Sequence, residues 1–155
     1  MTIRIQRILI PVDFSENSTA AVNYACALAE KYAAELHLLH ALEIHPITTP
    51  DFGMGLDLPR YAEEPRASAA KKFGQLLDPT WSQKHAVVQA IVEGSPVKEI
   101  IGYARTQTID LIVISTHGRT GLAHVLMGSV AENIVRMAPC PVLTVRPDGH
   151  QFVMP

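Results

Sequence analysis

Two glycines and a serine in the second half of the chain form a candidate phosphate site. Gly118 follows the apolar run 110–115, and Gly128 with Ser129 comes after nine intervening residues, where helical spacing begins. The start of a helix presents unpaired backbone N–H groups and the positive end of the helix dipole, which favour phosphate. Glycine has no Cβ to block an anion, and the Ser129 hydroxyl can donate a hydrogen bond. The alternative is that the glycines only make a turn and Ser129 only caps a helix.

The elements that would position this segment alternate along the chain. Apolar runs predict strands over 7–13, 36–41, 85–92, 110–115 and 141–145, and helical spacing predicts helices over 15–32, 66–77, 96–106 and 129–137. This alternation is typical of the α/β class. We expect an open, doubly wound, Rossmann-like parallel sheet of five strands, in the order 3-2-1-4-5, with helices on both faces.

Such a sheet binds ligands outside the carboxyl ends of its strands, where the strand order reverses. Here the reversal falls between the first and fourth strands, so we expect Asp13 to meet the segment 115–121. The stretch 42–65 contains four prolines and two glycines, which favour a long irregular loop leaving the end of the second strand. Ser95 is predicted to cap a helix that starts at Pro96. We expect one domain over 1–147 and a tail over 148–155.

Composition restricts the class of partner. The 155 residues are 48% hydrophobic and 18% charged, with a formal net charge of −2, which gives no general attraction to nucleic acid or anionic membranes. There is no signal-like N-terminus and no run long enough to span a membrane, so we expect a cytoplasmic protein. Cys26 and Cys140 do not form a disulfide framework, and Cys26 is expected to be a small buried apolar residue.

The motif Ser115-x-x-Gly118-x9-Gly128-Ser129 resembles the signature of the universal stress protein family. The stretch 10–15 (IPVDFS) resembles the first strand and turn of that family, and 38–41 (LLHA) its second strand. The resemblance extends from about Arg7 to Arg146. ATP-binding members of the family carry G-x-x-G-x9-G-[ST], and Ser115 stands in place of the first glycine, where its side chain could crowd the ribose or hydrogen-bond to it.

The resemblance implies a dimeric stress-response regulator that binds ATP, ADP or AMP. Asp13 and the backbone of Ala41 would contact the adenine, and Pro11, Val12 and Ser115 would line the ribose. The phosphates would be surrounded by Gly118, Arg119, Gly128, Ser129 and Val130, with His117 within reach of the ligand. Mg²⁺ or Mn²⁺ would arrive through the phosphates. The last strand, Val142–Val145, would pair across a homodimer, which would also cover an exposed sheet edge.

Two other functions stay open. A slow ATPase or an adenylyl-transfer enzyme could use the same fold, although no lysine follows Lys98 to serve a phosphoryl-transfer P-loop. The second open function is that of a dimeric chaperone-like protein that binds no nucleotide. Asp13-x-x-Glu16 also matches a helix-capping pattern. We assign no catalytic residue and no metal ligand, because His37 and His40 should point to opposite faces of a strand and His117 and His124 lack ligands at a suitable spacing.

Overall fold

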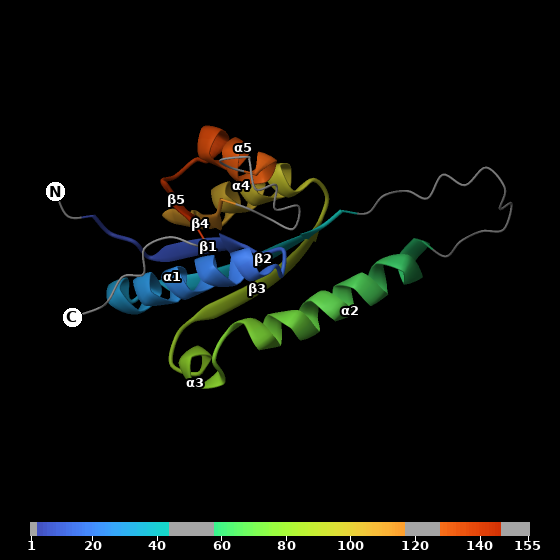
Figure 1. Cartoon of the computed structure of the whole chain (residues 1–155), viewed down its shortest axis with the longest axis horizontal. Helices are drawn as coiled ribbons and strands as arrows, with labels where there is room; N and C mark the ends of the chain where they lie inside the picture. Colours follow the sequence, from blue (N-terminus) through green and yellow to red (C-terminus); the bar gives the residue numbers. More distant parts are fainter. Residues whose placement is uncertain (1–2, 44–57, 117–127, 147–155) are drawn as a thin grey trace, which may run out of the picture.

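Five parallel strands form one sheet in the computed structural model, which describes residues 3–43, 58–116 and 128–146 (Figure 1). The order is β3-β2-β1-β4-β5, so the predicted order 3-2-1-4-5 is confirmed. Each neighbouring pair is parallel, and the carboxyl ends of the strands therefore lie at one edge. The strands are β1 (Arg7–Pro11), β2 (Glu35–Leu42), β3 (Val87–Glu93), β4 (Leu111–Ser115) and β5 (Val142–Val145).

Helices cover both faces of this sheet. The helices are α1 (Glu16–Tyr32), α2 (Leu58–Leu76), α3 (Pro79–Ser82), α4 (Pro96–Thr106) and α5 (Ser129–Met137). Helices α1 and α2 pack on one face, and α4 and α5 pack together on the other (Figure 1). The doubly wound arrangement follows from parallel strands, since each crossover places a helix on the sheet.

The core is divided by the sheet, which explains the apolar runs in the sequence. On β1, Ile8 and Ile10 pack in the cluster under α1 and α2, whereas Leu9 packs in the cluster under α4 and α5. All three side chains are fully buried, because alternate residues of a strand point to opposite faces and both faces are covered.

Helix α2 begins earlier than predicted. We expected an irregular chain up to residue 65, but Leu58 to Leu76 is helical and Pro65 lies inside the helix. Pro59, at the second helical position, needs no intrahelical N–H partner, whereas Pro65 costs one backbone hydrogen bond, about 3 kcal/mol. Ala69 and Phe73, buried on α2, anchor the helix to the sheet and offset that cost. The rest of the expected loop, 44–57, lies outside the described residues.

Two local details also differ from the sequence predictions. Helix α3 was not predicted, although Asp78 before Pro79 is a capping signal, and the Asp78 carboxylate accepts hydrogen bonds from the N–H groups of Thr80 and Trp81. Ser95 precedes α4 as expected, but its side chain makes no capping hydrogen bond. Gly94 has φ +143° there, a backbone conformation that L side chains rarely adopt, so this position favours glycine.

Phe73 gives a test of how α2 is attached. Its side chain is 1% exposed and packs against the edge of the Phe14 ring, with centroids 5.3 Å apart. Phe73→Ala should lower the free energy of unfolding by about 3–5 kcal/mol, because the cavity left behind cannot collapse fully. Urea denaturation measures the change. Gln75→Ala, an exposed site on the same helix, should change stability by less than about 0.5 kcal/mol; equal losses in both variants would contradict the packing described.

Cys26 gives a test with a pH dependence. It lies partly buried on α1, and burial, with a smaller contribution from Glu30, raises the pKa of its thiol from 9.0 to about 11. The reactive thiolate is therefore scarce near neutral pH and increases as the pH rises towards 11. In a Cys140→Ser background, iodoacetamide should modify Cys26 much more slowly at about pH 8 than it does in concentrated urea. Equal rates under the two conditions would contradict this environment.

Candidate functional site

The carboxyl end of β1 lies between the ends of β2 and β4. Leu9 is in register with His37 on one side and Ile112 on the other. Beyond the strand, the Val12 N–H donates to the Leu39 carbonyl at 2.9 Å, which keeps the chain beside β2. The sheet therefore brings the predicted contacts to one edge: Pro11 at the end of β1 with Val12 and Asp13 after it, Ala41 near the end of β2, and Ser115 at the end of β4.

Thr116 joins the end of β4 to the start of α5. Its N–H donates to the Val145 carbonyl at 2.9 Å, and its carbonyl accepts a hydrogen bond from the Gly128 N–H at 2.6 Å. Thr116 and Gly128, the described residues on either side of 117–127, are therefore held next to each other. The predicted contacts His117, Gly118 and Arg119 fall in this interval and lie outside the described residues.

The first turn of α5 presents the features expected at an anion site. Gly128 is the N-cap, with φ −67° and ψ 153°, and has no capping side chain. Ser129 is exposed at the first helical position, and Val130 after it is half-buried. Glu132 would repel an anion there, but its carboxylate is paired with Arg136 one turn further on, at 3.0 Å. The helix start is accessible, and the nearest acidic charge of its own first turn is neutralised in part.

The turn after β1 is organised by Asp13 and Ser15. Asp13 Oδ1 accepts hydrogen bonds from the Ser15 N–H at 3.0 Å and from the Ser15 hydroxyl at 2.6 Å. Ser15, and not Asp13, caps α1: its Oγ accepts from the Ser18 N–H at 3.3 Å. The Asp13-x-x-Glu16 match therefore does not mark the start of the helix, because the N-cap is Ser15 and the first helical residue is Glu16. Between the two residues, Phe14 adopts φ 62°, in the left-handed region.

The two histidines of β2 point to opposite faces, as the sequence predicts. His40 is buried on the α1 side, where its Nδ1–H donates to the Val12 carbonyl at 2.7 Å. His37 is buried on the α4 side, between the Glu35 carboxylate at 2.8 Å and the Tyr103 hydroxyl at 2.9 Å. Each ring thus forms a hydrogen bond between β2 and a neighbouring segment, the turn after β1 for His40 and helix α4 for His37. Within the ranges that the structure describes, no group of three or more His, Cys, Asp and Glu side chains is arranged to hold a metal ion.

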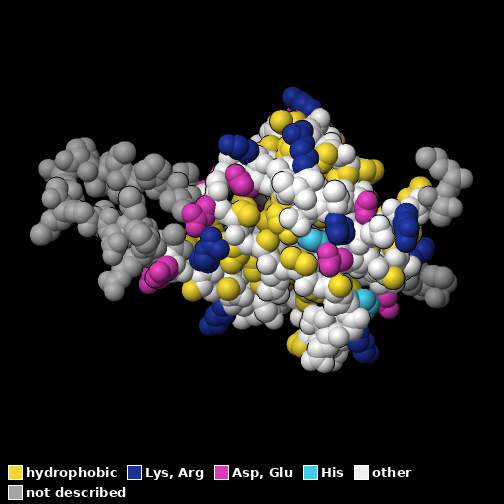
Figure 2. Space-filling view, turned by 180° about the vertical axis from the view of Figure 1, so that it is seen from behind, with side chains coloured by type: hydrophobic (Ala, Val, Ile, Leu, Met, Phe, Trp, Pro, Cys, Tyr) yellow, Lys and Arg dark blue, Asp and Glu magenta, His cyan; other side chains and the backbone are white. Residues whose placement is uncertain are grey.

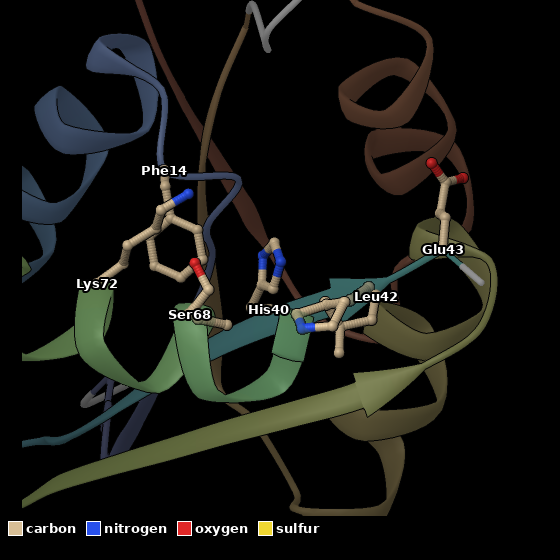
Figure 3. A pocket seen from close by; sticks show the side chains of 9 residues that line it. Phe14, His40, Leu42, Glu43, Ser68 and Lys72 are labelled. Carbon is tan, nitrogen blue, oxygen red and sulfur yellow. The ribbon is translucent and has the colours of Figure 1, made fainter. Parts of the chain in front are cut away.

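A cavity of about 400 Å³ lies where β2 ends, between the turn after β1 and helix α2 (Figure 3). Sequence reasoning did not assign it. From α2 it is lined by residues spaced three, four and seven apart on one helix face: Pro65, Ser68, Ala69 and Lys72. Ser68, Ala69 and Lys72 fall within the helix predicted over 66–77, whereas Pro65 falls in the stretch predicted as an irregular loop. The sheet side contributes Phe14, His40, Ala41, Leu42 and Glu43. The volume is in the range of small-molecule pockets.

The described surface carries both signs of charge. On the face seen in Figure 2, Lys and Arg side chains are interspersed with Asp and Glu. Such a face does not form the continuous basic stripe that nucleic acids require. In the described ranges no helix has both the length and the apolar composition needed to cross a membrane.

Comparison with known proteins agrees with this geometry. The family model for the universal stress protein family matches residues 4–146. The universal stress protein MJ0531 of Methanocaldococcus jannaschii is 33% identical over 142 residues, covering 91% of this chain and 82% of that protein. Among solved structures, the universal stress protein UspA from Lactobacillus plantarum is 28% identical with a TM-score of 0.79, covering 94% of this chain and all of that one.

Two more distant structures share the fold. One is a universal stress protein in complex with cAMP, at 24% identity and a TM-score of 0.63, covering 94% of this chain and 100% of that one. The other is the universal stress protein from Archaeoglobus fulgidus in complex with dAMP, at 18% identity and a TM-score of 0.56, covering 92% and 98%. At these identities the likeness concerns the fold alone. The family match over residues 4–146 and the relative at 33% identity decide the assignment: the chain belongs to the universal stress protein family.

Proposed function

We propose that this protein binds an adenine nucleotide at the carboxyl edge of its sheet and acts in the cytoplasm as a dimeric regulator in the stress response. The observation that carries the proposal is the exposed, glycine-capped start of α5, held beside the end of β4 through Thr116. Solved proteins of the same fold hold cAMP and dAMP, and the adenine moiety common to the two supports the choice of ligand class.

In this proposal the ligand extends along the edge from β2 to α5. The adenine lies near Asp13 and the backbone of Ala41, and the ribose lies near Pro11, Val12 and Ser115. The phosphates face Gly128, Ser129 and Val130, with His117, Gly118 and Arg119 supplied by the neighbouring segment. Ser115 lies at the end of β4 and is 8% exposed. Mg²⁺ or Mn²⁺ would be held mainly by phosphate oxygens and water.

The proposed dimer forms through β5. This strand is at the edge of the sheet, and among the described residues no strand lies on its outer side in the order β3-β2-β1-β4-β5. Apolar side chains are exposed beside it: Leu143 on the strand, and Val135 and Met137 on the adjacent α5. Pairing with a second copy would cover both the edge and these side chains, and it would bring the two α5 helices close to one interface.

Gly128→Ala tests the phosphate end. The backbone at Gly128 suits alanine, so the added Cβ should act mainly by obstructing the anion and should weaken ATP binding about tenfold, which corresponds to about 1.4 kcal/mol. Isothermal titration calorimetry on protein stripped of nucleotide measures the affinity. Gly102→Ala on α4, where a Cβ would meet nothing within 4 Å, is the control and should bind as wild type does. Wild-type protein that gives no heat at millimolar ATP would contradict the proposed function.

Leu143→Asp tests the dimer. Leu143 is 38% exposed on β5, and a carboxylate there would meet its symmetry mate or its apolar neighbours at the proposed interface. Light scattering after size-exclusion chromatography should show a wild-type mass of about two chains and a variant mass of about one. Tyr32→Asp, at a position 42% exposed on α1, should leave the mass at two chains. A monomeric wild type, or a Leu143→Asp dimer, would refute this interface.

A further inference from the structure

Lys72 is the cationic side chain at the cavity beside β2. Its Nζ lies 5.4 Å from the centroid of the Phe14 ring, within the range of a cation–π contact (Figure 3). Among the residues that the structure describes, no carboxylate is within ion-pair distance of Lys72. Arg66 on the same helix differs, because it is paired with Glu93 at 3.1 Å. The ammonium group of Lys72 therefore retains hydrogen-bond donors for a ligand.

The walls of the cavity suit a flat ring. Phe14 is held in place by His40, with ring centroids 4.5 Å apart, and by the edge contact with Phe73. Ala69, which is buried, adds a small apolar surface from α2. Aromatic side chains of this kind form stacking surfaces for nucleobases, whatever the base, because every base has a π-face.

The polar groups of the cavity are arranged with different chemistry at its two ends. Lys72 and Ser68 both project from α2 towards Phe14, and each can donate a hydrogen bond (Figure 3). Glu43, the carboxylate among the lining residues, lies at the other end, beyond Leu42. A ring that rests against Phe14 therefore faces donors, and acceptor atoms on its edge would be recognised.

The residues that line this cavity include, or directly follow in sequence, the proposed base contacts. Phe14 directly follows Asp13, and Ala41 lines the cavity itself. A purine placed by those two contacts would lie next to residues that line the cavity. Purines carry acceptor nitrogens on their ring edge, which match the donors of Lys72 and Ser68.

We propose that Lys72 is a specificity-determining residue, whose ammonium donates a hydrogen bond to a ring nitrogen of the purine base, with Ser68 beside it. Helix α2 then forms one wall of the base end of the site and selects bases that carry an acceptor at that position. The inference rests on the proposed nucleotide function, because without a bound nucleotide Lys72 has no base to read.

Lys72→Met tests the donor, since methionine keeps an unbranched stem up to the ε position and removes the ammonium group. It should weaken ATP binding about tenfold in calorimetry, the loss of one charge-assisted hydrogen bond. Lys71→Met is the matched control: Lys71 is the exposed neighbour on α2 and does not line the cavity, so ATP should bind as to wild type. Inorganic tripolyphosphate should bind wild type and Lys72→Met equally, because it has no base.

A thermodynamic cycle separates recognition of the base from a general effect of charge. Wild type should bind one of 1-deaza-, 3-deaza- or 7-deaza-ATP about tenfold more weakly than ATP, and Lys72→Met should bind that analogue and ATP equally. Equal ATP affinity of wild type and Lys72→Met, or a loss that is the same for ATP and every analogue, would overturn the inference and leave the proposed function intact. Wild type that binds neither ATP nor tripolyphosphate would overturn both.

Discussion

The geometry of the candidate site depends on the two backbone hydrogen bonds of Thr116. One ties the end of β4 to the end of β5, and the other returns the chain to Gly128 beside β4. Thr116 is 4% exposed, so these bonds are sheltered from competition with water, and a buried backbone group left without a partner would be costly. The start of α5 is consequently fixed by the strands, independently of residues 117–127. An anion site at a helix start needs such positioning, because the favourable field of the helix falls off within one turn.

Much of the fold could be predicted because buried parallel strands leave a clear signal. The runs around Ile8–Ile10 and Ile112–Ile114 are apolar without alternation, which identifies strands covered on both faces and hence the α/β class. Helix α5 was predicted with its observed bounds, since Gly128 and Ser129 mark its start clearly. Right-handed crossovers restrict the possible strand orders, and the expected order 3-2-1-4-5 places its reversal between the first and fourth strands, as observed.

The beginning of α2 and the cavity could not be predicted for one physical reason. Pro65 in isolation disfavours a helix, and local propensity contains no information on what a helix packs against. The buried contacts of Phe73 and Ala69 with the sheet decide the outcome, and they join residues distant in sequence. Ser68 and Lys72 lie within the predicted helix 66–77, but the sequence does not show that this helical face lies opposite Phe14 and the end of β2. The cap of α1 could not be predicted from the sequence either. Asp13 and Ser15 lie in the same turn and both have side chains that can cap a helix, and only the backbone geometry selects Ser15.

Phe14 has a strained backbone conformation at the carboxyl edge of the sheet. Its φ of 62° is a conformation that glycine adopts freely and that a bulky side chain adopts at a cost of order 1 kcal/mol. Glycine would ease the turn, yet it would leave His40 and Phe73 without their aromatic neighbour and α2 without a surface to rest on near the mouth of the cavity. At position 14, therefore, a substitution that relaxes the backbone would also remove tertiary contacts. The local conformational preference and the tertiary packing favour different residues at this one position.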